Sequence, residues 1–310
     1  WTDVDHDDYP ELIIAGDFGA DEIYRNQGDG SFEDVTFDWG MGQAMNGMGL
    51  AVSDLDRDGD LDWMTGSIAL IHGSCQHVPN MMMGNRLYMN RLNEPGADTP
   101  LYEADFDAKV ACGAWSWGTV MADIDNDGDV DLAQTNGWFG VSASLQLYQF
   151  DIDRLWINSG DPLEGMQHCG GEVGFDDDNQ GRALISLDID ADGDLDFLAT
   201  RAGGTPLVYR NDGGNDADYL RVALRGTQSM TYGRGARIAL RAVEGGDWQV
   251  EEIGQSSHFA GHGELVAHFG LGTGPDTLHE LRVCWPASGL MQKLNDVSPN
   301  AQITLNEDDA

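Results

Sequence analysis

Short runs of small and apolar residues alternate with turn residues along most of the chain. Examples are GMGLAVS (residues 47–53), WSWGTVMA (115–122) and GRALISL (181–187), and none of them has a helical period. Each is followed, across a turn, by a second short run: LDWMTGS, VDLAQTN or LDFLATR. Runs of this length between turn signals are typical of β-strands joined as hairpins, and 41 glycines are present to form turns. The pattern predicts an all-β chain.

The turn inside each predicted hairpin is an acidic motif that repeats. DLDRDGDLD (54–62) recurs as DIDNDGDVD (123–131) and DIDADGDLD (188–196), with a looser copy, DVDHDDYPE, at 3–11. The first residues of the copies lie 51, 69 and 65 positions apart. After each hairpin a third run ends in an asparagine-containing turn, and edge-like runs such as FEDVTF and LYEADFD close the unit. These spacings are those of four-stranded blades, so the sequence predicts β-propeller blades.

Five carboxylates in one turn repel one another unless a cation lies between them. Two carboxylates about 4 Å apart repel by roughly 1 kcal/mol in water and about 4 kcal/mol at the effective permittivity of a protein surface. In D-x-D-x-D-G-x-x-D, the side chains at positions 1, 3 and 5 can converge, glycine at 6 allows a sharp turn, and the carbonyl at 7 and the carboxylate at 9 add oxygens. Ligands that are all oxygen suit Ca²⁺ better than Zn²⁺ or copper, and Mg²⁺ keeps more of its water.

The sequence therefore predicts about four calcium sites, one in each loop, with the first as the weakest match because Asp8 replaces glycine and Glu11 replaces the last aspartate. The predicted ligands, by side chain or by the carbonyl at position 7, are Asp3, Asp5, Asp7, Tyr9 and Glu11; Asp54, Asp56, Asp58, Asp60 and Asp62; Asp123, Asp125, Asp127, Asp129 and Asp131; and Asp188, Asp190, Asp192, Asp194 and Asp196.

An EF-hand is the main alternative for such loops, and the sequence argues against it. An EF-hand needs a bidentate glutamate at position 12 and a helix on either side. Position 12 is Ile14, Thr65, Gln134 or Ala199 in the four copies, and no helical period flanks them. A dockerin-type loop is excluded on the same grounds.

The repeats resemble the FG-GAP or VCBS repeats that form the blades of integrin α-chain β-propellers. Gly49 and Gly118 stand five residues before their loops, as in that family, and Trp117-Gly118 replaces its Phe-Gly, whereas the fourth unit has Ala183 there. The resemblance implies a ring of about seven blades. Here three units look full and the first begins inside its loop. We therefore expect the chain to be the C-terminal part of a longer polypeptide, or partner chains to complete the sheet edges.

The C-terminal hundred residues lack the loop and resemble a different family. YLRVALRGTQSMTYGRGARIAL (219–240), HFGLGTG (268–274) and LRVCWPASG (281–289) are similar to the ASPIC/UnbV domain that follows such repeats in the cartilage acidic protein family. The turn 229–232, Ser-Met-Thr-Tyr, departs from the Asn and Asp usual in that family. Alternation in LRVALRG and ARIALRA independently predicts half-buried strands. The predicted domains are propeller repeats over 1–211 and a β-sandwich-like ASPIC/UnbV domain over 212–310.

Composition limits the partners and the location. With 54 acidic and 16 basic residues the formal charge is −38, which disfavours nucleic acid and anionic membranes as partners. No run of eighteen apolar residues predicts a transmembrane segment. Calcium loops of the extracellular kind would be mostly empty at cytosolic calcium, so we expect an extracellular, periplasmic or cell-surface location.

Signals for catalysis are sparse. His258, His262 and His268 surround a glycine-rich stretch, and His72 and His77 flank Cys75, but core packing is the simpler interpretation. No GxSxG, Walker or HExxH motif is present, and the four cysteines, Cys75, Cys112, Cys169 and Cys284, have no metal-like spacing. Met81–Met83 could form an exposed contact or fill the core.

Two function classes remain open. The preferred one is a secreted or cell-surface calcium-binding propeller that is not an enzyme and that binds a protein or glycan partner, in adhesion or as a subunit of an extracellular assembly. The alternative is an extracellular enzyme that uses the propeller as a scaffold and acts on polysaccharide. Fold resemblance does not choose between them.

Overall fold

Four antiparallel sheets follow one another along the first two-thirds of the chain in this computed structural model, which describes residues 1–42, 46–69, 84–92, 94–96, 101–103, 110–139, 148–164, 166–254 and 259–310. Within each sheet the strands are neighbours in chain order. The sheets are β1 (Leu12–Ile14), β2 (Glu22–Asn26) and β3 (Phe32–Asp34); β4 (Leu50–Ser53), β5 (Asp62–Thr65), β6 (Arg86–Asn90) and β7 (Leu101–Glu103); β8 (Ser116–Ala122), β9 (Asp131–Asn136), β10 (Arg154–Ile157) and β11 (Gln167–His168); and β12 (Gly181–Leu187), β13 (Asp196–Arg201) and β14 (Leu207–Tyr209).

The acidic motifs connect the first two strands of their units, as the hairpin prediction required. In the second unit Ser53 pairs with Asp62 across the loop, and the equivalent pairs join β8 to β9 and β12 to β13. In the first unit a single bridge, Thr2 with Glu11, precedes β1. The β1 strand therefore corresponds to β5, β9 and β13, the second strands of the other units.

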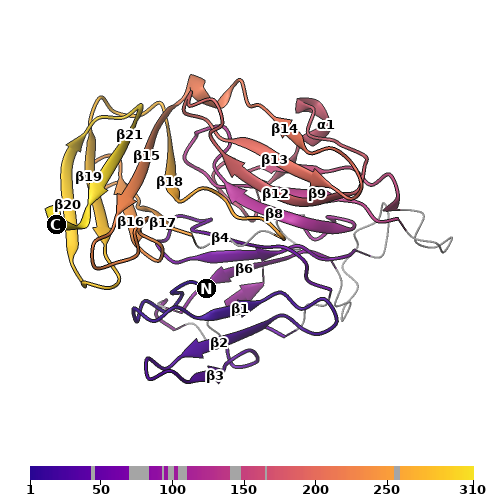
Figure 1. The fold of residues 1–310 in the computed structure, drawn as a ribbon, viewed down its shortest axis with the longest axis horizontal. Helices are drawn as coiled ribbons and strands as arrows, with labels where there is room; N and C mark the ends of the chain where they lie inside the picture. The colour runs from indigo at the N-terminus through magenta and orange to yellow at the C-terminus, as the bar shows by residue number, and fades with distance from the viewer. Residues whose placement is uncertain are drawn as a thin grey trace.

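The innermost strands β4, β8 and β12 lie side by side near the middle of the molecule (Figure 1). Glycines at the contacts allow the backbones to approach closely. A Cβ at Gly49 would overlap the Trp117 carbonyl oxygen, and one at Gly118 would lie 2.5 Å from the Leu184 nitrogen. This explains the two glycines of the repeat motif, because each occupies the point where one blade contacts the next. Ala183, the fourth unit's residue at this position, belongs to the last of these strands in chain order.

Apolar cores fill the spaces between neighbouring sheets. Met64, Leu87 and Leu132 belong to a core between the second and third units, and Val120, Leu184 and Phe197 belong to one between the third and fourth. The core between the first and second units contains Ile23, Val52 and Trp63, and also Val250 from the C-terminal region. Face-to-face packing of successive sheets is the arrangement of propeller blades.

The prediction of three full units is corrected by the structure. Only the second and third units have four strands among the described residues. After β14 the chain passes through a 3₁₀ turn, Gly214–Asp216, directly into the C-terminal region, so no outer strand follows β14. Closure into a ring of about seven blades stays a prediction.

The C-terminal region forms two sheets packed face to face. Its strands are β15 (Asp218–Arg225), β16 (Arg237–Arg241), β17 (Gln249–Glu252), β18 (Val266–Gly272), β19 (Leu278–Cys284), β20 (Met291–Val297) and β21 (Ala301–Asn306), arranged as β18-β15-β21 and β17-β16-β19-β20. Val222, Ile238, Leu281 and Phe269, from both sheets, are at most 1% exposed in the shared core. We call this part the C-terminal module; its predicted boundary after residue 211 stays a prediction.

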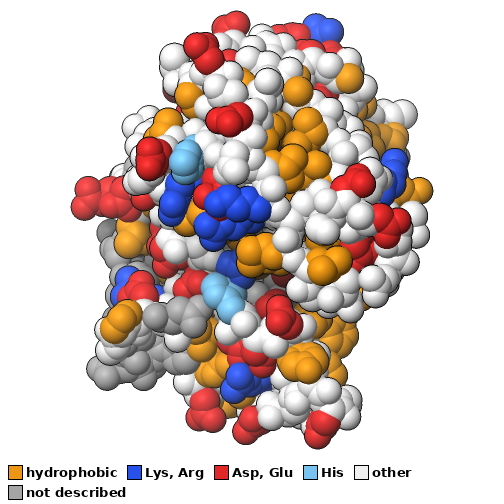
Figure 2. Space-filling view, turned by 90° about the vertical axis from the view of Figure 1, so that its left-hand side faces the viewer, with side chains coloured by type: hydrophobic (Ala, Val, Ile, Leu, Met, Phe, Trp, Pro, Cys, Tyr) orange, Lys and Arg blue, Asp and Glu red, His pale blue; other side chains and the backbone are white. Residues whose placement is uncertain are grey.

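The C-terminal module lies at the end of the blades from which the acidic loops project (Figure 1). Seen from the side of this module, several Lys, Arg and His side chains gather left of centre in a patch that runs downward, with Asp and Glu around it (Figure 2). The helical segments α1 (Gly170–Val173), Gly214–Asp216 and Glu307–Asp309 are single turns. In the part of the chain that the structure describes, no helix has the length and hydrophobicity to cross a membrane.

Candidate metal centres

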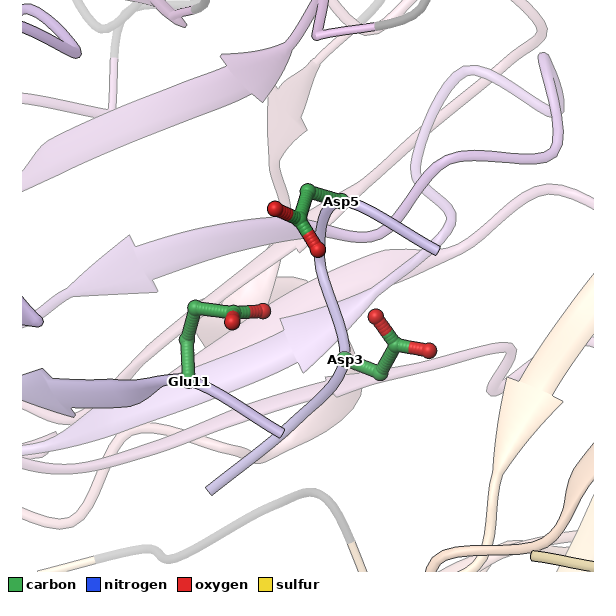
Figure 3. A group of neighbouring side chains, drawn as sticks. All are labelled: Asp3, Asp5 and Glu11. Carbon is green, nitrogen blue, oxygen red and sulfur yellow. The ribbon is translucent and has the colours of Figure 1, made fainter. Parts of the chain in front are cut away.

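Each acidic loop gathers three carboxylates into a group that could hold a metal ion. One oxygen from each side chain lies within 4.8 Å of the others in every group. Figure 3 shows the first group, whose carboxylates surround a common space. The groups are Asp3, Asp5 and Glu11; Asp54, Asp56 and Asp58; Asp123, Asp125 and Asp127; and Asp188, Asp190 and Asp192.

A left-handed backbone turn accompanies the convergence of positions 1, 3 and 5 in the last three loops, whereas the first loop's group has Glu11 at position 9 in place of Asp7 at position 5. Position 4 has a φ of 58–61° in all four loops, although its residues are unrelated: His6, Arg57, Asn126 and Ala191. Glycine at position 6 has a φ of 94–100° in the last three loops, which confirms the predicted reason for glycine there. In the first loop Asp8 adopts a φ of 70° instead. No feature of the amino-acid sequence indicated the left-handed turn at position 4.

Hydrogen bonds inside the second and third loops leave one oxygen of the first aspartate free. The Gly59 amide donates to Asp54 Oδ1 over 3.3 Å, and the Gly128 amide donates to Asp123 Oδ2 over 2.8 Å. The other oxygens, Asp54 Oδ2 and Asp123 Oδ1, are buried and have no hydrogen-bond partner. A buried carboxylate oxygen without a partner is costly, and a bound cation would remove that cost. These two loops therefore fit a cation well, and Asp5 Oδ1 in the first loop is also buried without a hydrogen-bond partner.

The pKa values of the first aspartates in these two loops are raised, mainly because the carboxyl groups are buried. Burial, with a smaller contribution from the neighbouring carboxylates Asp58 and Asp56, raises the pKa of Asp54 to about 8, although the hydrogen bond from the Gly59 amide opposes the rise. Burial has the same effect on Asp123, whose pKa is also raised to about 8. A metal ion would oppose these shifts, because it favours the ionised carboxylates that serve as ligands.

Arginines contact the carboxylates of the first and fourth loops. Arg25 Nε lies 2.7 Å from Asp5 Oδ2, and Arg25 Nη2 lies 3.3 Å from Asp7 Oδ2. In the fourth loop Arg221 Nη1 lies 2.9 Å from Asp188 Oδ2. Each guanidinium neutralises part of the charge that a cation would otherwise balance.

The carboxylate at position 9 fastens its loop to the rest of the blade. Asp62 Oδ2 accepts the Leu55 amide over 2.8 Å, and Asp62 Oδ1 accepts the Asn90 amide over 2.7 Å. Glu11, Asp131 and Asp196 accept the equivalent pairs of amides in the other loops. A carboxylate has about four lone-pair sites, so coordination by these groups stays a prediction. The asparagine-containing turns of the sequence thus have a structural role.

The side chains at position 7 contact other parts of the chain, and only the carbonyl was predicted as a ligand there. Asp60 Oδ1 lies 3.3 Å from His6 Nε2, and Asp129 Oδ1 lies 2.6 Å from Arg57 Nη2. Asp194 Oδ2 accepts the Asn215 amide over 3.1 Å. The side chain of Tyr9, the first loop's residue at this position, is 48% exposed.

The position-4 side chains link the loops in series, which sequence reasoning missed. His6 of the first loop contacts Asp60 of the second, and Arg57 of the second contacts Asp129 of the third. Asn126 of the third donates to the Gly193 carbonyl of the fourth over 3.0 Å. Ala191 ends the series. The only signal in the sequence was that the side chains at position 4 of the first three loops can donate hydrogen bonds, whereas that of Ala191 cannot.

The remaining candidates from the sequence have simpler structural roles or lie outside the described residues. His268 is 9% exposed, and burial together with Arg221 lowers its pKa to about 3, so the imidazole is neutral. His262 is exposed. Cys112 is disulfide-bonded, whereas Cys169 and Cys284 are half-buried free thiols. His72, Cys75, His77, Met81–Met83 and His258 lie outside the described residues.

Comparisons with known proteins agree with this architecture. Residues 3–65 match the FG-GAP-like repeat family, and residues 226–310 match the ASPIC and UnbV family. Cartilage acidic protein 1 of Mus musculus is 26% identical over 287 residues, which cover 91% of this chain and 40% of that protein. The Homo sapiens protein is 25% identical over 292 residues, with the same coverages, and the Xenopus tropicalis protein is 27% identical over 285 residues, covering 89% and 39%.

The chain spans about two-fifths of the length of these relatives, because the matched region covers 39–40% of each. The two family matches lie at opposite ends of the chain: one spans the first unit and the first two strands of the second, β4 and β5, and the other lies on the C-terminal module. The chain therefore combines an FG-GAP-like repeat region with an ASPIC and UnbV domain, and it is homologous to cartilage acidic protein 1 over 91% of its length.

Proposed function

We propose that the chain is part of a secreted or cell-surface binding protein whose acidic loops hold about four calcium ions. The observation that supports this best is the buried, unpartnered oxygen of Asp54 and of Asp123 within groups of three carboxylates. All ligands on offer are oxygens, which favours calcium over zinc or copper. The name of the cartilage relatives is in keeping with an extracellular location.

Calcium at extracellular concentrations would contribute much of the stability of this fold. For a dissociation constant near 10⁻⁴ M and a free concentration about tenfold higher, mass action stabilises the folded state by roughly 1.4 kcal/mol per site. Four such sites would add about 5–6 kcal/mol, which is comparable with the whole stability of an ordinary domain. The ions would then be structural parts of the protein.

Binding is favoured over catalysis as the activity. Among the described residues, the only free thiols, Cys169 and Cys284, have pKa values raised chiefly by burial, which makes them poor nucleophiles. The buried histidine, His268, is occupied by a hydrogen bond to Asn126. A protein or glycan at the extracellular surface is the partner class we propose, with further chain or partner subunits completing the blades. The alternative is an enzyme that acts on polysaccharide. In that case the chain would degrade acidic glycans, and a single substitution outside the acidic loops would abolish this activity.

Calcium binding is tested directly on the purified chain. Calorimetric titration in metal-free buffer should show at least two tight sites, assigned to the second and third loops, and weaker binding at the other two. Asp56→Asn and Asp125→Asn should each remove one tight site, and magnesium at the same concentration should bind more weakly. Absence of bound calcium at millimolar concentration, with an unchanged melting temperature, would refute the proposal.

A further inference from the structure

The C-terminal module contacts all four acidic loops. Glu252 on β17 accepts a hydrogen bond from the Asp3 amide over 3.2 Å, and Arg237 on β16 donates to the Gly59 carbonyl. Arg221 on β15 pairs with Asp188. The third loop has the most extensive contact, and it is made by the HFGLG segment of β18.

Asn126 is the centre of this contact. Its side chain is fully buried and donates to the carbonyls of Gly193 and Gly214 over 3.0 Å each. Because the amide group donates twice, its Oδ1 is the acceptor, and His268 Nε2 donates to it over 2.6 Å. The backbone carbonyl of Asn126 also accepts the Gly272 amide over 2.7 Å. The residue at position 4 of the third loop is thus held by β18 on two sides.

Gly270 makes room for a predicted ligand. A Cβ at this position would overlap Asp123 Oδ2 and would lie 2.5 Å from the Asn126 Cα atom. Asp123 Oδ2 is the oxygen that accepts the Gly128 amide, and the other oxygen of the same carboxylate is the unpartnered one. A cavity lined in part by Asp123, Glu251, Glu264 and His268 lies beside the contact. The position of the Asp123 carboxylate therefore depends on the backbone of another domain.

We propose that β18 of the C-terminal module is part of the cation site of the third loop, with Gly270 and His268 as positioning residues for Asp123 and Asn126. This inference rests on the proposed calcium binding. Without a cation the carboxylates of the loop repel one another, and the loop no longer presents Asn126 and its carbonyl to β18. Binding at the loop and docking of the module therefore strengthen each other by the same factor, as linkage requires.

A substitution in the module tests this from a distance. Gly270→Ala should weaken calcium binding at one of the two tight sites by at least about tenfold, equivalent to about 1.4 kcal/mol, in calorimetric titration of the whole chain. Gly19→Ala is the matched control, because a Cβ at Gly19 would meet nothing within 4 Å. In an Asp125→Asn background, which already lacks the third site, Gly270→Ala should have no further effect on calcium binding. Full affinity in Gly270→Ala would overturn the inference.

A measurement on the unaltered protein covers the case in which Gly270→Ala does not fold. The Gly272 amide, which donates to the Asn126 carbonyl, should exchange its hydrogen at least about tenfold faster in metal-free buffer than in calcium. The exchange rate of the Val222 amide, in β15 of the C-terminal module, should be the same in both buffers. Calcium binding with an unresponsive Gly272 amide would contradict this inference alone. Failure to bind calcium at all would instead contradict the proposed function.

Discussion

Single glycines decide how closely parts of this protein approach one another. Gly118 lets β8 pack its backbone against β12, and Gly270 lets β18 pack against the third loop. Neither position needs a left-handed backbone, so the reason for glycine is space, in contrast with Gly59 and Gly128, whose φ values are 94° and 98°. Two different physical requirements thus account for glycines that look alike in the sequence.

Gly118→Ala should lower the free energy of unfolding by about 1–3 kcal/mol, because the added methyl group must displace the backbone of the next blade. Urea denaturation in saturating calcium measures the change. Gly19→Ala, whose methyl group enters open space, should differ from the unaltered chain by much less. Equal stability of the two variants would show that the blades can separate slightly at no cost.

At the scale of elements, the turn 227–229 of the C-terminal module depends on one carboxylate. Glu307 accepts the amides of Thr227, Gln228 and Ser229 and the hydroxyls of Ser229 and Ser288, over 2.7–2.9 Å. Burial acts to raise its pKa, but the hydrogen bonds from Ser288, Ser229 and Thr227 outweigh it and hold the pKa well below its ordinary value. The Ser229 turn, which departs from the family pattern, therefore still has a polar role.

Glu307→Gln should lower the melting temperature at neutral pH, because the charged acceptor of six hydrogen bonds, including one of 3.4 Å from the Thr227 hydroxyl, is lost. A depressed pKa gives stability that is fully present above the unfolded-state value of about 4.5 and is lost as the pH falls below it. The difference between the variant and the unaltered chain should therefore shrink as the pH falls from 6 toward 3. Glu244→Gln, at an exposed position, is the control and should show no such convergence.

At the scale of the whole molecule, negative charge has two effects: the carboxylates of the loops repel one another, and they also provide the groups that the C-terminal module contacts. The formal charge of −38 includes buried carboxylates in every acidic loop, and the C-terminal module contacts the face where they gather. Arginines at the first and fourth loops neutralise part of this charge. Arg57 also pairs with Asp129 of the third loop, but Asp54 and Asp123 each keep a buried oxygen without a hydrogen-bond partner, where an external cation would contribute.

The melting temperature should fall with rising pH in metal-free buffer but not in calcium. Burial raises the pKa of Glu11, Asp54 and Asp123 to about 8, so the metal-free folded state binds more protons than the unfolded chain. Its melting temperature should fall as the pH rises from about 4 to about 8. In calcium the ion competes with those protons, and the melting temperature should hold or rise over the same range.

Asp54→Asn combined with Asp123→Asn serves as the control for that dependence. The variant lacks two of the groups with raised pKa, so its metal-free melting temperature should fall less steeply with pH at constant ionic strength. A slope equal to that of the unaltered chain would mean that general charge repulsion, and not these two buried carboxylates, sets the dependence.

The sequence was sufficient for the strands and for the carboxylates of the loops, because both repeat with a fixed period. The hairpins around Asp54, Asp123 and Asp188 and the triads at positions 1, 3 and 5 follow from that repetition alone. The contacts of Arg25 with Asp5 and of His268 with Asn126 join segments with no shared pattern, and Arg221 reaches Asp188 from another domain. Only the tertiary fold shows which loops are already partly neutralised.

The parallel pairing of β15 with β21 has a consequence for how the protein is made. Leu220 of β15 lies opposite Ala301 of β21. The sheet that contains β15, the first strand of the C-terminal module, is therefore complete only when β21, the last strand, has paired with it. During synthesis the blades can assemble while that sheet still has an open edge. We therefore expect the C-terminal module to complete this sheet only after β21 has been synthesised, which makes it a late step in folding.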